Sequence, residues 1–166
     1  MTVEEIYVAI APKLTNYLVG SGSSYATACD IVQETFVRVW KRRDELLDDW
    51  DQVGGFVFTI ARNYRVDLLR KTARETLQPE ILDAGSYQSD FESDDEAAEI
   101  RRRVDAALAT LPPTLREAFA LFRLGGLSVR EIARQTNTTE SNVKVRIHRA
   151  TAKMRIALGT SGRRSG

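Results

Sequence analysis

Apolar residues recur along this chain at helical intervals, and no stretch shows the strict apolar–polar alternation of a half-buried strand. The pattern predicts a first helix from Val3 to Val19, which Pro12 either kinks or splits. Glycine and serine at positions 20–24 end it, and a second helix is predicted from Tyr25 to about Arg43. Positions 44–55 are predicted as a loop that closes with two glycines.

A third helix is predicted from about Phe56 to Lys71. Each of these helices has one apolar face, so the first part of the chain is expected to form a small bundle. The stripe of the second helix comprises Ala28, Ile31, Val32, Thr35, Phe36, Val39 and Trp40. The inward face of the third helix is expected to comprise Phe56, Ile60, Tyr64 and Leu68.

Residues 74–100 lose this periodicity and gain acidic, serine and glycine residues, which is typical of a linker with little core of its own. Helical signals return from about Ala98 and continue almost to Gly159, and residues 160–166 are expected to be a frayed tail. The sequence therefore predicts an all-α protein. Two small helical domains, 1–73 and 101–159, are joined by the acidic linker 74–100.

Local signals in the second domain predict a helix-turn-helix. The segment Ser128-Val129-Arg130-Glu131 is a capping box that begins a short helix ending near Thr136. Asn137 stands where the turn requires a left-handed residue, and Thr138 or Thr139 caps the next helix. The buried stripe of that helix is expected to be Val143, Ile147, Ala150 and Met154. Upstream, Leu111-Pro112-Pro113 begins a supporting helix, which Gly125-Gly126 ends.

The second helix of this unit is polar and basic on its outer face, as expected of a helix that lies in the DNA major groove. Charge supports this interpretation, because residues 111–166 hold eleven basic and three acidic residues, whereas residues 72–100 hold one basic and nine acidic ones. A helical hairpin with a solvated charged face remains the alternative. The outer face comprises Ser141, Asn142, Lys144, Arg146, Arg149 and Lys153.

Composition narrows the chemistry further. One cysteine (Cys29) and one histidine (His148) exclude most zinc and nucleophile–histidine sites by simple counting, and no catalytic residue, cofactor or metal is predicted. No apolar run is long enough to span a membrane, and residues 1–14 do not resemble a secretory signal, so a cytoplasmic protein without membrane insertion is expected.

Three segments, in order, resemble the extracytoplasmic-function (ECF, group 4) sigma factors of bacterial RNA polymerase. Residues 30–36 followed by Trp40 resemble region 2.2, and residues 58–63 with Asp67 and Arg70 resemble regions 2.3 and 2.4. Residues 127–133 and 142–150 resemble region 4.2. The resemblance covers about residues 3–71 and 101–158, and it implies a factor, not an enzyme, that binds core polymerase and directs it to promoters.

The resemblance also implies roles for individual residues. Contacts to core polymerase, through the clamp helices of its largest subunit, are implied for Asp30, Gln33, Glu34 and Trp40. Contacts to the minus-10 element are implied for Trp50, Arg62, Asn63, Arg65, Arg70 and Lys71, with Trp50 equally explained as a core anchor. Contacts to the minus-35 element are implied for Arg130, Glu140, Ser141, Asn142, Lys144, Arg146 and Arg149.

Further partners implied by the resemblance are the polymerase beta flap, promoter DNA and an anti-sigma factor. The acidic linker is either a segment that threads the polymerase cleft or a solvated tether. The chain departs from the family in having Phe56 where many members have tryptophan, Val145 where a small polar residue is common, and Asn137 in place of a turn glycine. A stand-alone helix-turn-helix regulator is the alternative function.

Substitution of Asp30 and Gln33 distinguishes the two functions. In a sigma factor, Asp30→Ala with Gln33→Ala removes contacts to core polymerase, and gel filtration with core enzyme then shows lost co-elution while circular dichroism shows an intact fold. A stand-alone regulator has no use for these positions, and its DNA binding and repression remain unchanged by the same pair of substitutions.

Overall fold

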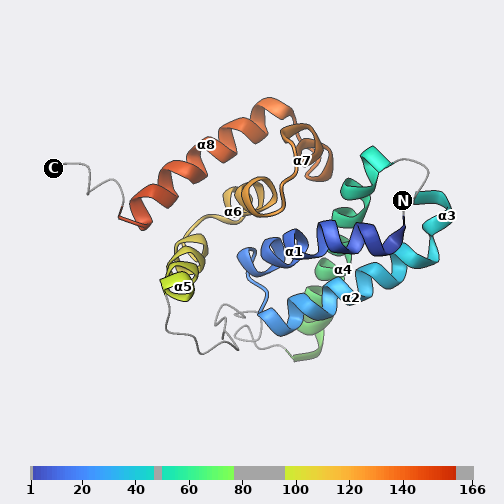
Figure 1. Ribbon diagram of the computed structural model, residues 1–166. Coiled ribbons are helices and arrows are strands. Elements are labelled where there is room, and N and C mark those ends of the chain that lie inside the picture. The colour runs from blue at the N-terminus through green and yellow to red at the C-terminus, as the bar shows by residue number, and fades with distance from the viewer. Residues whose placement is uncertain (1, 47–49, 77–95, 160–166) are drawn as a thin grey trace.

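The computed structural model describes residues 2–46, 50–76 and 96–159, and the described residues are helical with no strand among them. The first 76 residues contribute α1 to α4, and the remainder contributes α5, α6, η2, α7 and α8. Figure 1 shows α1 at the centre, with α2 and α4 on one side and the later helices on the other. The all-α prediction is confirmed.

Helix α1 (Val3–Gly20) is continuous through Pro12, so of the two alternatives, a kink or a split, the split is wrong. Thr2 caps the helix in a capping box with Glu5. Pro12 is exposed, so its ring and the backbone hydrogen bond that it removes do not disturb the buried face. That face carries side chains with no exposed surface, among them Ile6, Leu14, Tyr17 and Leu18.

Helix α2 (Tyr25–Lys41) begins at Ser24, whose hydroxyl accepts the Thr27 amide at 3.1 Å. Six of the seven residues predicted for its stripe are buried. Trp40 is the exception, because its side chain is 47% exposed and the guanidinium carbon of Arg43 lies 4.0 Å from its ring centroid. The expectation that Trp40 packs in the core is therefore wrong.

The loop predicted at positions 44–55 is largely helical, which corrects the sequence prediction. Helix α3 (Arg43–Leu46) is one short turn, and α4 (Trp50–Thr76) continues through Gly54 and Gly55. Two valines one turn apart, Val53 and Val57, lie in the core and hold this first part of α4 in place despite the cost of glycine in a helix.

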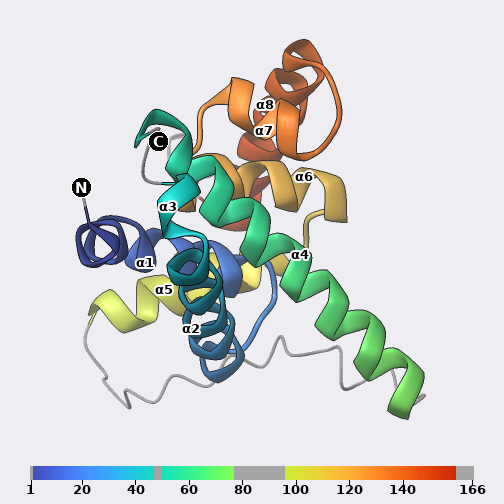
Figure 2. The ribbon, with the colours of Figure 1, turned by 90° about the vertical axis from the view of Figure 1, so that its right-hand side faces the viewer.

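The earlier start also changes which face of α4 is buried. Phe56 is 40% exposed, whereas Phe58 and Ala61 are buried, so the prediction that Phe56 faces inward is wrong. Ile60, Tyr64 and Leu68 are partly buried against the core, as expected. Figure 2 shows the C-terminal half of α4 extending beyond the neighbouring helices.

Helices occupy both ends of the predicted linker, because α4 ends at Thr76 and α5 (Glu96–Ala109) begins at Glu96. Positions 77–95 between them, and the predicted tail at 160–166, lie outside the described residues. Helix α6 (Pro113–Phe119) begins at the two prolines as predicted and continues as a π-helix, η2 (Ala120–Leu124). Gly125 and Gly126 then end it, the latter with a φ of 75°.

Apolar side chains from both halves of the chain meet in one continuous core. Leu14, Leu18 and Phe58 from the first four helices belong to the same cluster as Leu121 of η2 and Leu127, which precedes α7. A smaller second cluster, with Leu108, Leu115 and Met154 among its members, joins α5, α6 and α8. The C-terminal helices are thus seated directly on α1 and α4.

Truncation of a buried side chain on α2 tests this core. Ile31 has no exposed surface, so Ile31→Ala is expected to lower the free energy of unfolding by about 2–5 kcal/mol, measured by urea denaturation. Val8 is 75% exposed, and Val8→Ala is expected to change the free energy of unfolding by less than about 0.5 kcal/mol. Equal effects of the two substitutions would contradict the packing described.

Candidate functional site

A helix-turn-helix forms where the sequence predicts it. Helix α7 (Val129–Gln135) begins at Ser128, whose hydroxyl accepts the Glu131 amide at 3.1 Å. The Glu131 carboxylate bonds Arg134 at 3.3 Å, so the reciprocal half of the predicted capping box is replaced by an ion pair on the same helix. Asn137 forms the turn with a φ of 56°, and Thr139 caps α8 (Glu140–Ala157) by accepting the Asn142 amide at 3.0 Å.

Helix α8 lies at the edge of the molecule (Figure 1). Its outer face is exposed, polar and basic. Val143, Ala150 and Met154 are buried beneath it, and Ile147 is partly buried, as the sequence predicts. Arg146 is half-buried, and the side-chain amide of Asn142 donates to the Thr138 hydroxyl at 2.8 Å. The predicted DNA contacts that are exposed are Arg130, Glu140, Ser141, Asn142, Lys144 and Arg149. This face combines amide and hydroxyl groups that can bond base edges with cations that can bond phosphates.

A groove of about 430 Å³ lies between η2 and α8 on the same half of the molecule. Its floor includes Phe122, Val129 and Ile147, which are half-buried, and Arg123 and Lys144 stand among its exposed lining residues. His148 also lines it and is exposed. An apolar floor with a basic rim is suited to a helix or loop that presents apolar and acidic side chains.

The residues predicted to meet core polymerase lie on α2. Asp30 and Gln33 are exposed, and Glu34 is half-buried and bonds Arg38 at 3.0 Å. Trp40 lies two turns further along the helix, exposed beside Gln33. The structure therefore brings these four predicted residues onto the accessible side of one helix.

An apolar groove of about 340 Å³ adjoins that surface, and sequence reasoning did not identify it. Tyr7 and Val37 line it, and each is 45% exposed, while the Tyr7 ring lies edge-on to Phe36 at 4.9 Å. Both residues fall outside the buried stripes of their helices. That position off the stripe is the one signal in the sequence that could have indicated them.

The residues predicted to read the minus-10 element divide into two groups on α4. Asn63, Arg70 and Lys71 are exposed, the last two on the projecting C-terminal half. Arg62 and Arg65 are half-buried and engaged in contacts within the protein. Trp50 begins α4, but its side chain lies outside the described residues.

Arg65 and Arg116 converge on the C-terminus of α1. Arg65 donates to the carbonyl of Ser21 at 2.7 Å, and Arg116 of α6 donates to that of Gly20 at 2.7 Å. Two guanidinium groups thus satisfy carbonyls at the negative end of the helix dipole, where α1 has no basic residue of its own. Burial and the neighbouring Arg65 lower the pKa of Arg116, against an opposing effect of Asp105.

Arg62 and Glu117 form an ion pair between α4 and α6. The Glu117 Oε2 atom accepts from Arg62 Nε at 2.6 Å and from the Tyr17 hydroxyl at 2.9 Å. Burial raises the pKa of the Tyr17 hydroxyl, and the Glu117 carboxylate raises it further. The pKa of Arg62 is raised because Glu117 and Tyr17 outweigh the lowering effect of burial.

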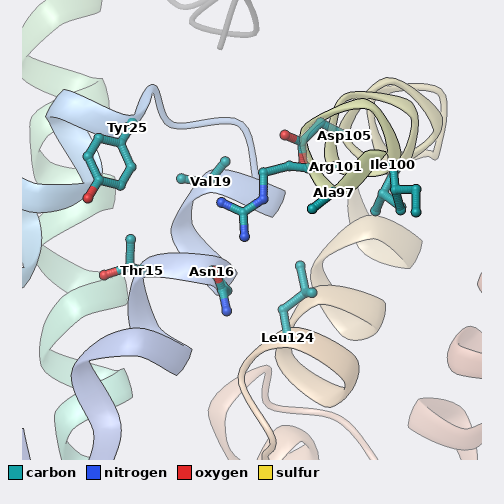
Figure 3. A pocket seen from close by; sticks show the side chains of 10 residues that line it. Thr15, Asn16, Val19, Tyr25, Ala97, Ile100, Arg101, Asp105 and Leu124 are labelled. Atoms are coloured by element: carbon teal, nitrogen blue, oxygen red, sulfur yellow. The ribbon is translucent and has the colours of Figure 1, made fainter. Parts of the chain in front are cut away.

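A cavity of about 390 Å³ lies between α1 and α5. Figure 3 shows the Arg101 guanidinium extending from α5 toward α1, above Asn16 and Leu124. The Asp105 Oδ2 atom is buried there without a hydrogen-bond partner among the described residues. Burial raises the pKa of the Asp105 carboxyl, and Arg101 and Arg116 oppose that rise.

Within the described residues, no cluster of three or more His, Cys, Asp or Glu side chains could hold a metal ion. Nor does any described helix combine the length and apolar character needed to cross a membrane. Cys29 is half-buried and unpaired by disulfide.

Two family matches cover most of the chain. Residues 6–75 match the family "Sigma-70 region 2", and residues 101–154 match "Sigma-70, region 4". The chain is 28% identical to the ECF RNA polymerase sigma factor SigM of Bacillus subtilis, covering 93% of this chain and 94% of that protein. It is 31% identical to the ECF RNA polymerase sigma factor RpoE of Cereibacter sphaeroides (91% and 83%), and 33% identical to the ferric citrate uptake sigma factor FecI of Escherichia coli (90% and 87%).

Solved structures agree in fold. The sigma factor RpoE of Bartonella quintana, in complex with the anti-sigma factor NepR, superposes with a TM-score of 0.70 at 23% identity, covering 94% of this chain and 96% of that one. CnrH, in complex with the cytosolic domain of CnrY, gives a TM-score of 0.68 at 24% identity, covering 95% and 88%.

Substitution at the turn tests the helix-turn-helix geometry. Because Asn137 has a positive φ, Asn137→Ala is expected to lower the free energy of unfolding by about 1 kcal/mol, whereas Asn137→Gly is neutral or stabilising. Thermal unfolding followed by circular dichroism measures both. Equal tolerance of alanine and glycine would contradict the left-handed turn.

Proposed function

The chain belongs to the ECF sigma factors, the alternative sigma factors that direct promoter-specific transcription initiation, and from that membership we propose which of its surfaces bind polymerase and promoter. The observation that carries the proposal is the exposed polar face of α8 on a correctly capped helix-turn-helix. An initiation factor of this kind contributes binding surfaces and performs no catalysis. It acts in the cytoplasm, where core polymerase and the chromosome are.

The exposed side of α2 binds the clamp helices of the largest polymerase subunit. Asp30 and Gln33 supply polar contacts, and Trp40 with the adjoining groove of Tyr7 and Val37 supplies the apolar contact. An exposed tryptophan beside an apolar groove is a typical anchor of a protein interface. The groove between η2 and α8 takes the beta flap, because it offers an apolar floor and a basic side chain, Arg123, at its rim.

Promoter DNA is bound at two places. The first turns of α8, with Ser141, Asn142 and Lys144, enter the major groove of the minus-35 element, and Arg149 meets phosphate. The exposed side of α4, with Asn63, Arg70 and Lys71, meets the melted minus-10 element, where a base flipped from the stack is held. A two-site contact of this kind is weak without core polymerase and strongly dependent on salt.

Regulation by a separate protein accompanies this function. Two solved relatives are bound to the anti-sigma factor NepR or to the cytosolic domain of CnrY, and an anti-sigma factor that covers both halves of this chain is expected by analogy. The alternative of a stand-alone regulator leaves the exposed Trp40 surface without a purpose.

Run-off transcription tests the proposal. Purified chain and bacterial core polymerase, supplied with a fragmented genomic library from the source organism, are expected to give discrete transcripts that start downstream of a shared two-part motif. Absence of transcripts, together with absence of core binding in gel filtration, would support the stand-alone regulator.

A promoter found in this way allows a matched comparison on α8. Lys144→Ala is expected to weaken promoter binding by the holoenzyme and to reduce the slope of log affinity against log salt by about one. Arg102→Ala removes the same charge from the exposed face of α5 and is expected to change neither quantity. Equal effects would indicate a general charge effect in place of a contact by Lys144.

A further inference from the structure

We propose that Glu117 is an autoinhibitory latch, which holds the free protein in a closed form where the C-terminal half covers part of the DNA-binding face of α4. This inference rests on the proposed function, because it takes α4 as the minus-10 reader. It adds that the reader is occupied by the protein itself before polymerase and promoter are engaged. Three groups of contacts carry it.

The first is the occupation of Arg62. Its Nε atom donates to Glu117 at 2.6 Å, and one of its terminal nitrogens donates to the Gln135 carbonyl at 3.0 Å. Both acceptors belong to the C-terminal half, and only 26% of the Arg62 side chain is exposed. Two of the five N–H donors of this guanidinium are thus used within the protein, and burial restricts the access of a phosphate to the others.

The second is the charge of Glu117. Residues 111–166 contain three acidic residues against eleven basic ones, and Glu117 forms an ion pair with Arg62 of α4. A carboxylate repels the phosphates that this basic segment attracts, so Glu117 is unsuited to a DNA contact of its own. Its oxygen occupies Arg62 as a phosphate oxygen would, by a short charge-assisted hydrogen bond.

The third is the close approach of α7 to the beginning of α4. The Gln135 side-chain amide donates to the Gly55 carbonyl at 3.0 Å. A Cβ atom on Gly55 would lie 2.5 Å from Glu131 Oε1, so the two elements are in contact with no space between them. A nucleic-acid strand cannot reach this part of α4 until α7 moves away.

Glu117 therefore competes with DNA for the same cation, and the competition sets how readily the closed form opens. Closed, the carboxylate pairs with Arg62 and Tyr17. Open, Arg62 is released for phosphate while Glu117 and Tyr17 are hydrated. A ligand shifts such an equilibrium only by its preference for one state, and both promoter and polymerase prefer the open one.

Glu117→Ala tests the latch in the full chain. The substitution leaves Arg62 and the Tyr17 hydroxyl without their shared acceptor in the closed form only, so the open fraction is expected to rise by about tenfold. Small-angle X-ray scattering should show a larger radius of gyration. Fluorescence anisotropy should show about tenfold tighter binding of a labelled single-stranded oligonucleotide that carries the minus-10 motif.

Glu99→Ala is the matched control. It removes the same charge from the same half of the chain, at an exposed position where Glu99 pairs with Arg102 on its own helix. It is expected to leave the radius of gyration unchanged and to raise oligonucleotide affinity no more than a single charge does. Should Glu117→Ala fail to fold by circular dichroism, Glu117→Gln replaces it, because the amide keeps the shape and removes the charge.

An unchanged radius of gyration in the folded Glu117 variant would overturn the latch. If both variants bind the oligonucleotide, equal affinity of the Glu117 and Glu99 variants would also overturn it. The scattering result does not depend on DNA. If the Glu117 variant opens but no variant binds the oligonucleotide, Glu117 still holds a closed form, but the assignment of α4 as the minus-10 reader fails.

Discussion

The contact between the two halves of the chain is the constraint on which the rest of the structure depends. Leu121 and Phe58 lie in one buried cluster, although they belong to different family matches. Apolar burial holds the two halves together but does not specify how they are oriented, because the hydrophobic effect is non-directional. The hydrogen bonds of Glu117 to Tyr17 and Arg62 favour one orientation. The position of every proposed binding surface relative to the others follows from this contact.

The same contact determines which of the proposed binding surfaces are exposed in the closed form and which are covered. The α2 face with Trp40 and the α8 face with Lys144 both stay exposed. The first turns of α4 lie within it, against α7. Under the proposed assignment, the closed form leaves the polymerase-binding and minus-35 surfaces exposed and covers part of the minus-10 surface.

Most of the helices and the outward face of α8 could be predicted because their causes are local. Ser24, Thr139 and the turn at Asn137 act on amides within a few residues of themselves. The failures share a different cause. The two glycines predicted to end a loop lie inside α4, because Val53 and Val57 are anchored in a core built partly by distant residues.

The sequence by itself determined most of the helices, the helix-turn-helix, the family and the outward face of α8, since helical periodicity, capping and charge are properties of neighbouring residues. Only the tertiary structure decided that Arg62 meets Glu117, 55 positions away, and that Tyr7 and Val37 form a groove beside Trp40. Nothing in a local pattern specifies such pairs, because they depend on how whole helices pack against one another.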